Sequence, residues 1–100
     1  MKRRTLPDGR WFDLDTAKSF DEDTYWNGHN HISVATGSQW DHECLYRTAS
    51  GLWVLEQTSA YQHVQDMYMQ IDNDAAARWL VRNGHKPHPA CAEEYAALEL

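Results

Sequence analysis

The chain has few of the residues that mark a specialised class of protein. Its two cysteines, Cys44 and Cys91, are too few for a disulfide framework, so we expect reduced thiols and a cytoplasmic protein. It has no apolar run long enough to span a membrane, and its first residues lack the apolar segment of an export signal. Apolar residues make up 42% of the chain, which is typical of a globular rather than a disordered protein. The composition favours one globular domain over residues 1–100.

Basic residues are also scarce. Nine Lys and Arg against fifteen Asp and Glu give a net charge of -6, which argues against a broad basic face that binds DNA or RNA directly. The only basic cluster, Lys2-Arg3-Arg4, lies at the N-terminus, where it is typical of a solubilising tail. We expect a protein partner and no direct contact with nucleic acid.

The acidic residues gather in the first quarter of the chain. Most such runs form a solvated face, but an acidic face also suits docking on the basic groove of a nucleic-acid enzyme. The candidate interface acids are Asp13, Asp15, Asp21, Glu22 and Asp23.

Aromatic residues are abundant. Five Trp and five Tyr exceed what the core of a 100-residue domain needs, so some of them should lie at the surface. Tyr and Trp near turns can anchor a protein interface or can fold back to cover a small sheet. The candidates near turns are Tyr25, Trp26, Trp40 and Tyr61.

The second half of the chain has the clearest structural pattern. Residues 40–48 and 52–58 flank a turn at Ala49-Ser50-Gly51 and should pair as a hairpin. Adjacent apolar residues in both segments indicate central strands that are covered on both faces over at least part of their length. Residues 64–71 alternate more cleanly, which predicts an amphipathic third strand at a sheet edge or on a half-exposed face.

A helix should follow the third strand. Asp72 can cap its N-terminus and Asp74 lies in the first turn, where a carboxylate interacts well with the helix dipole. Trp79 and Leu80 should anchor the helix on the sheet, and Gly84 is placed to end it.

The flanking segments are less clearly patterned. The apolar spacing predicts a short helix over residues 14–21, and residues 22–40 are expected to form a loop with a turn at Asn27-Gly28 and a strand over 32–35. A last helix should begin after Pro89. The expected fold is therefore α+β, with a three- to four-stranded antiparallel meander, one helix packed on a face and short terminal helices.

One cluster has the residue types of a metal site. His85, His88 and Cys91 recur at three-residue spacing, and zinc accepts all three side chains. The alternative is that both histidines lie in an exposed loop and that Cys91 belongs to the core.

Catalytic patterns are weaker still. Cys44 with His42 and His63 could be written as a nucleophile and bases, but a cysteine in a strand is usually a small apolar residue. The chain has no glycine-rich phosphate loop and no nucleophile elbow. We expect neither an enzyme nor a cofactor.

Residues 32–37, 45–55 and 75–80 resemble a loose group of small bacterial proteins that share a Leu-Tyr-Arg-Thr hairpin followed by an Ala-Ala-x-Trp-Leu helix. Proteins of this group often come from phages, plasmids and other mobile elements. The resemblance implies a shared hairpin and docked helix, and it carries no catalytic residue.

Together these features predict a small acidic protein-binding module, with an inhibitor of a host nucleic-acid machine, of the anti-CRISPR kind, as the sharpest hypothesis. Its partner would be a nucleic-acid-binding effector. Two alternatives stay open: a small zinc-binding or regulatory domain, and a self-associating protein in which residues 64–71 pair across a two-fold axis of a homodimer.

Overall fold

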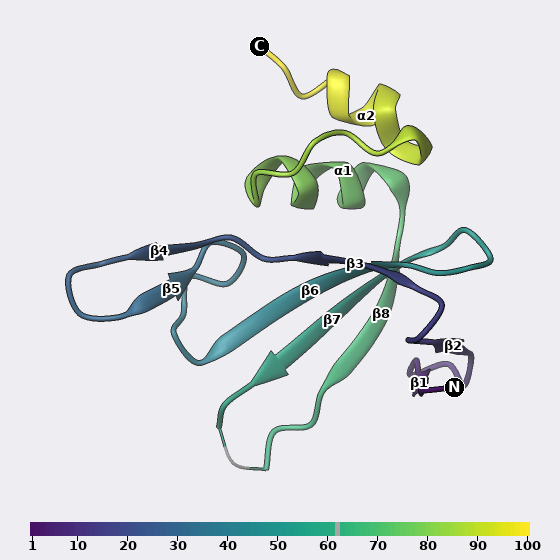
Figure 1. Ribbon diagram of the computed structural model, residues 1–100, viewed down its shortest axis with the longest axis horizontal. Helices are drawn as coiled ribbons and strands as arrows, with labels where there is room; N and C mark the ends of the chain where they lie inside the picture. The colour runs from purple at the N-terminus through teal and green to yellow at the C-terminus, as the bar shows by residue number, and fades with distance from the viewer. Residues whose placement is uncertain (62) are drawn as a thin grey trace.

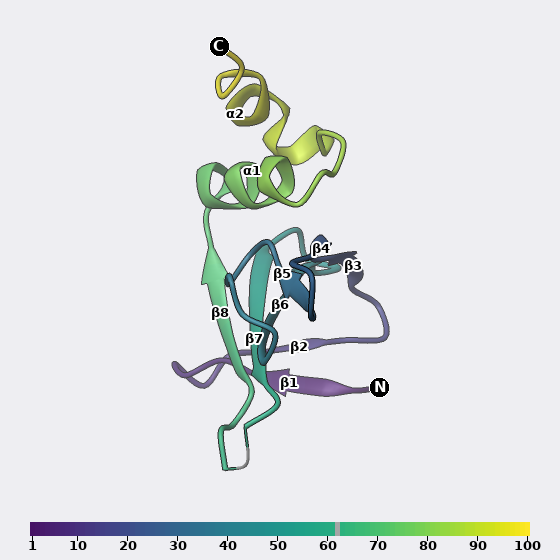
Figure 2. The same cartoon turned by 90° about the vertical axis from the view of Figure 1, so that its left-hand side faces the viewer.

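The computed structural model describes residues 1–61 and 63–100, and its centre is a four-stranded antiparallel sheet in the order β3-β6-β7-β8 (Figure 1). The strands are β3 (Lys18–Asp21), β6 (Asp41–Arg47), β7 (Trp53–Ser59) and β8 (Met67–Ile71). Helix α1 (Asn73–Arg82) lies on one face of this sheet, and a small hairpin lies against the other face (Figure 2). The α+β class and the β6-β7-β8 meander predicted from the sequence are confirmed.

Strands β6 and β7 are buried on both faces at the ends next to their turn, where the adjacent apolar residues lie. Leu45 and Trp53 point toward α1 and are almost completely buried, whereas Tyr46 and Val54 point to the opposite face. The turn between the strands needs Gly51, whose φ of +87° is in the left-handed region that glycine adopts without steric cost.

Helix α1 has the predicted caps. Oδ1 of Asp72 accepts a hydrogen bond from the N–H of Ala75 at 2.8 Å, and Gly84 ends the helix with a φ of +74°. Trp79 and Leu80 are buried against the sheet, as expected. The indole Nε1–H of Trp79 also donates to Glu43 on β6 at 3.1 Å, which fixes the helix relative to the strand.

A second core lies under the other face of the sheet. It is closed by the hairpin of β1 (Arg3–Thr5) and β2 (Trp11–Asp13). The Phe12 ring packs 5.7 Å from the ring of Tyr46 and 5.8 Å from that of Tyr68, measured between centroids.

The C-terminal segment forms the 3₁₀ turn η1 (Pro89–Cys91) and helix α2 (Ala92–Ala96), which pack on the outer side of α1. This confirms the predicted last helix. Among the helices of residues 1–61 and 63–100, none is long and apolar enough to cross a membrane.

The helix predicted over residues 14–21 is wrong. Residues 14–17 form turns, and Lys18–Asp21 form strand β3 at the edge of the sheet. The three apolar residues whose spacing suggested a helix are partly buried in different places: Leu14 and Ala17 pack against the second core, and Phe20 packs against Trp53 on the α1 side. One short helix could not direct them to both faces of the sheet.

Residues 22–40 are more regular than predicted. They contain a second hairpin, β4 (Thr24–Trp26) and β5 (His31–Ser33), which projects away from the sheet (Figure 1). The predicted Asn27-Gly28 turn closes it: Oδ1 of Asn27 accepts two backbone hydrogen bonds across the turn, and Gly28 has a φ of +101°. We call this hairpin the β4–β5 arm.

The packing of α1 predicts unequal effects for two adjacent aliphatic residues. Leu80 is completely buried and Val81 is exposed. Leu80→Ala should therefore lower the free energy of unfolding by about 2–5 kcal/mol, and Val81→Ala by less than about 0.5 kcal/mol. Urea denaturation followed by circular dichroism measures both changes, and equal losses would contradict this helix orientation.

Candidate interaction surface

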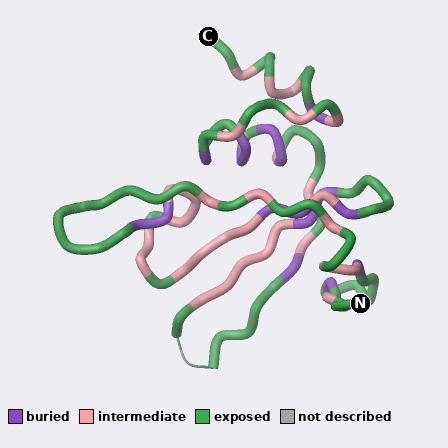
Figure 3. The backbone as a smooth tube through the Cα atoms, viewed as in Figure 1, coloured by how far each residue is buried: buried purple, intermediate pink, exposed green. Residues whose placement is uncertain are grey.

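The β4–β5 arm presents large aromatic side chains to solvent. All three residues of β4 are exposed, with Tyr25 at 51% and Trp26 at 59% of their full accessible surface. The Trp26 ring packs edge-on against the ring of His31 on β5, with centroids 5.2 Å apart. The arm is held at its base, where Ile32 and Ser33 are buried (Figure 3).

The base of the arm is fastened to β6. The Glu22 side chain is largely buried, and its Oε1 accepts a hydrogen bond from the N–H of Glu43 at 2.6 Å. Its Oε2 lies 2.8 Å from Nδ1 of His42. Glu22 therefore fixes the chain where it leaves β3 for the arm.

The base of the arm is also fastened to the end of α1. The N–H of Asp23 donates to Oδ1 of the buried Asn83 at 2.9 Å. The amide nitrogen of Asn83 donates in turn to the carbonyl of Trp79 at 2.9 Å. Because the arm is joined to both the sheet and the helix, its aromatic residues have a defined direction relative to the core.

The structure separates the predicted acidic residues into two groups. Asp13 and Asp15 lie before β3, where Asp13 accepts backbone hydrogen bonds and Asp15 pairs with the N-terminal amine at 3.3 Å. Asp21 is the last residue of β3 and Asp23 follows it, and both are exposed at the base of the arm. The five predicted acids thus do not form one face, and Glu22 has a structural role.

The other two predicted aromatic residues form a pair of their own. Trp40, just before β6, and Tyr61, after β7, are 45% and 55% exposed. Their ring centroids are 5.8 Å apart. All four aromatic residues predicted from the sequence are therefore exposed, at two places on the molecule.

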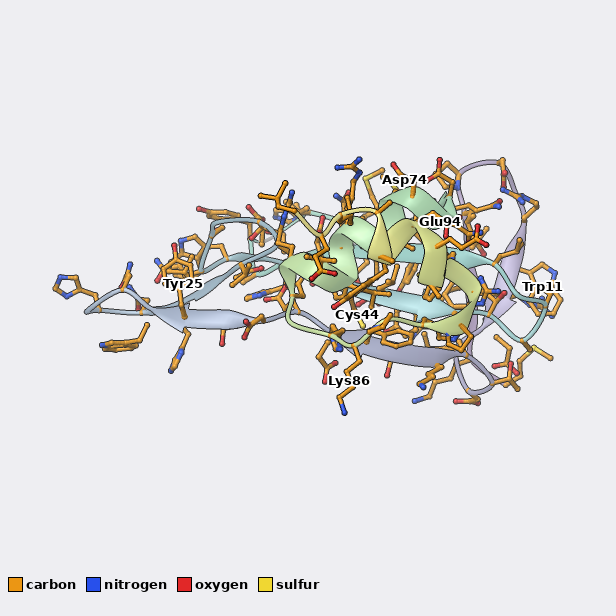
Figure 4. The ribbon with its side chains drawn as sticks, turned by 90° about the horizontal axis from the view of Figure 1, so that it is seen from above. Trp11, Tyr25, Cys44, Asp74, Lys86 and Glu94 are labelled. Atoms are coloured by element: carbon orange, nitrogen blue, oxygen red, sulfur yellow. The ribbon has the colours of Figure 1, made fainter. Side chains whose placement is uncertain are left out.

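The sequence interpretation missed Trp11. This residue is 50% exposed on β2, and the guanidinium of Arg3 lies 4.4 Å from the centre of its ring. It is at the opposite end of the molecule from Tyr25 (Figure 4). The signal was present in the alternation of the strand, because a buried Phe12 requires its neighbour to face outward.

Trp11 borders a mainly apolar hollow of about 430 Å³ between the β1–β2 hairpin and the sheet. Its lining includes Leu6, Trp11, Phe12, Leu52 and Val54.

The predicted zinc ligands have other partners. Nε2 of His85 lies 2.6 Å from the carbonyl oxygen of Asp21, and Nδ1 of His88 accepts a hydrogen bond from Ala90 N–H at 3.0 Å. Cys91 is completely buried in the core. Within residues 1–61 and 63–100, no three His, Cys, Asp or Glu side chains are grouped so as to hold a metal ion. The geometry does not support the zinc prediction.

Cys44 is not arranged as a nucleophile. Its thiol donates to the carbonyl oxygen of Phe20 at 3.3 Å, and burial raises the pKa of Cys44 above its ordinary value. Nδ1 of His42, the nearby candidate base, faces Glu22 instead. The thiol is therefore held in its unreactive protonated form.

Comparisons of the chain with known protein families, with curated proteins and with solved structures find no match.

Glu22 and Asp21 are adjacent carboxylates with different environments, so their alanine variants can be compared directly. Glu22→Ala leaves the Glu43 N–H without its acceptor and should lower the free energy of unfolding by about 1–3 kcal/mol. Asp21→Ala removes an exposed carboxylate and should change it by less than about 0.5 kcal/mol. Urea denaturation measures both changes. If Glu22→Ala left the free energy of unfolding unchanged, the arm would not be fastened through this side chain.

His88 predicts a dependence of stability on pH. Burial, followed by the charges of Arg47 and Lys18, lowers the pKa of His88 below its ordinary value. The unfolded chain therefore binds a proton at His88 more readily than the folded chain, so this contribution to stability is present above the ordinary pKa of histidine, about 6.5, and decreases as the pH falls below it.

The variant His88→Asn tests this dependence, since an asparagine can still accept the hydrogen bond from Ala90 N–H. Melting temperatures are measured by differential scanning fluorimetry from pH 7.5 to pH 5. Because the variant has no imidazole to protonate on unfolding, its melting temperature should fall less steeply with decreasing pH than that of the wild type. Parallel profiles would contradict a depressed His88 pKa.

Proposed function

We propose that this chain is a small acidic protein-binding module that inhibits a nucleic-acid enzyme by covering its basic surface. The observation that carries the proposal is the β4–β5 arm, which holds Tyr25 and Trp26 in solvent beside the exposed carboxylates of Asp21 and Asp23. The mobile-element resemblance of the sequence favours an inhibitor of the anti-CRISPR kind.

The aromatic residues supply the expected anchors. Tyr and Trp are enriched among the residues that contribute most to binding free energy, because they bury a large area and lose little side-chain entropy. Tyr25 and Trp26 lie on opposite sides of a short strand. A partner cleft that receives the arm can therefore contact one ring on each wall.

The acidic residues favour a basic partner surface. A surface that binds the phosphates of nucleic acid is basic, and a protein of net charge -6 is attracted to such a surface and repelled by the nucleic acid itself. Asp21 and Asp23 would meet Lys or Arg at the rim of the contact, which mainly accelerates association. The proposal assigns the protein to the cytoplasm, where Cys44 and Cys91 remain reduced.

Affinity capture from a bacterial lysate, with bound proteins identified by mass spectrometry, tests the proposal. We expect the wild-type chain to retain a nuclease or another nucleic-acid enzyme. The double variant Tyr25→Ala/Trp26→Ala should weaken binding to the purified partner by about 30-fold or more, as loss of a binding hot spot does. Trp11→Ala, at the opposite end of the molecule, should bind like the wild type.

The acidic part has its own control. Asp21→Lys/Asp23→Lys should slow association with the partner, measured by surface plasmon resonance at low salt. Glu93→Lys/Glu99→Lys changes the net charge equally but lies in the C-terminal segment, and should have a smaller effect. Equal effects would reduce the role of the acids to net charge, and a partner that is insensitive to the arm variants would contradict the proposed surface.

A further inference from the structure

The two edges of the central sheet differ in their protection. The β3 edge is short and bears Lys18 and Asp21, and Nε2 of His85 contacts the outward carbonyl oxygen of Asp21. Charged residues and covering groups of this kind prevent an edge strand from pairing with another chain. Strand β8, at the other edge, has no neighbouring strand on its outer side among residues 1–61 and 63–100 (Figure 2).

The hydrogen-bond register shows which backbone groups of β8 point outward. At the two ends of the β6–β7 pair, Thr48 N–H donates to the carbonyl of Leu52, and Ala60 N–H donates to the carbonyl of Trp40. Even-numbered residues of β6 and β7 therefore bond to each other, and odd-numbered residues of β7 bond to β8.

Each residue of β8 is placed by this alternation. Met67, Met69 and Ile71 oppose odd-numbered residues of β7 and use their backbone groups there. The N–H and C=O groups of Tyr68 and Gln70 point away from the sheet. The outer edge thus presents two donors and two acceptors in the spacing of an antiparallel ladder.

The side chains of β8 leave this edge open. Met67–Ile71 contains no charged residue, no proline and no glycine. The Tyr68 side chain turns inward, where its hydroxyl donates to Glu56 at 2.8 Å and accepts from Arg4 at 3.1 Å. Met67 is 49% exposed. Such an uncharged and regular edge is a template for a further strand.

We propose that β8 pairs with β8 of a second copy of this chain, antiparallel about a two-fold axis, to form one continuous sheet of eight strands. An antiparallel edge is complementary to itself, since each outward N–H meets an outward C=O when the strand is turned by 180°.

The charges flanking β8 select the register. A two-fold axis at Met69 would place Asp66 of each copy opposite Asp72 of the other, and like charges directly opposite are destabilising. An axis at Tyr68 places Gln70 opposite Asp66 and Met67 opposite Met69. In this second register, an amide faces a carboxylate on one face of the sheet, and two methionine pairs form on the other face. It places no like charges opposite each other, so the dimer adopts it.

The dimer is independent of the proposed inhibition. The β4–β5 arm follows β3, at the edge of the sheet opposite β8, so both arms of the dimer stay free. The net charge of -6 on each copy opposes association, and salt screens that repulsion. Dimerisation should therefore strengthen as the salt concentration rises.

Sedimentation velocity on the full chain, from low micromolar to near-millimolar protein and at low and high salt, tests the inference. We expect a species of twice the 11.6 kDa chain mass that increases with protein and salt concentration. Gln70→Pro removes one outward N–H and no bond to β7, and should shift the dimerisation constant at least about tenfold. Ser19→Pro, at the outward position of β3, should leave it unchanged.

Amide hydrogen exchange keeps the test decisive if a proline variant fails to fold. The amides of Tyr68 and Gln70 should exchange slowly only at concentrations that favour the dimer, whereas the amide of Met69, bonded to β7, should be protected at all concentrations. A chain that stays at 11.6 kDa under every condition would overturn the inference. So would a dimer in which the Tyr68 and Gln70 amides exchange freely.

Discussion

Two-sided burial of the β6–β7 hairpin is the constraint on which the rest of the structure depends. Leu45 and Trp53 are buried toward α1, and Tyr46 and Val54 toward the β1–β2 hairpin. Burial of each such side chain is worth about 1.5–3 kcal/mol, so both faces of the hairpin need a cover. Helix α1 and the N-terminal hairpin supply those covers, and the remaining elements follow from how the chain connects them.

The β4–β5 arm is the part of the molecule that this constraint does not require. All three residues of its strand β4 are exposed, so Tyr25 and Trp26 contribute little to the core. The arm is nevertheless anchored, through Glu22 on β6 and through Asn83 at the end of α1. Exposed aromatic residues on a fastened hairpin are consistent with selection for binding, because binding loses less free energy when the contact residues are already ordered.

The two edges of the sheet also differ, because one is covered and the other is open. At β3, charged residues and the imidazole of His85 occupy the outer side. At β8, Met67–Ile71 contains no charged residue, and Arg4 bonds to the inward hydroxyl of Tyr68. The chain therefore has one edge from which the arm extends and one edge whose backbone groups remain available. The arm and the second copy would use different sides of the same sheet.

The sequence by itself determined the elements whose signals are local. The β6–β7 hairpin, the capped helix α1 and the Asn27-Gly28 turn each depend on residues within a few positions of one another, so periodicity and cap chemistry predicted them. The excess of large rings over core volume predicted that some of them would be exposed, and the structure decided that Tyr25, Trp26, Trp40 and Tyr61 are among them.

Only the tertiary structure decided the rest. Residues 18–21 became a strand because the edge of β6 offered hydrogen bonds and because Phe20 and Leu14 pack against different cores. Asp13 and Asp15 are separated from Asp21 and Asp23 because the first pair precedes β3 and the second lies at and beyond its end. Glu22 became structural because β6 presents the N–H of Glu43 beside it. These outcomes depend on contacts between residues far apart in the chain, and a local sequence pattern carries no record of such contacts.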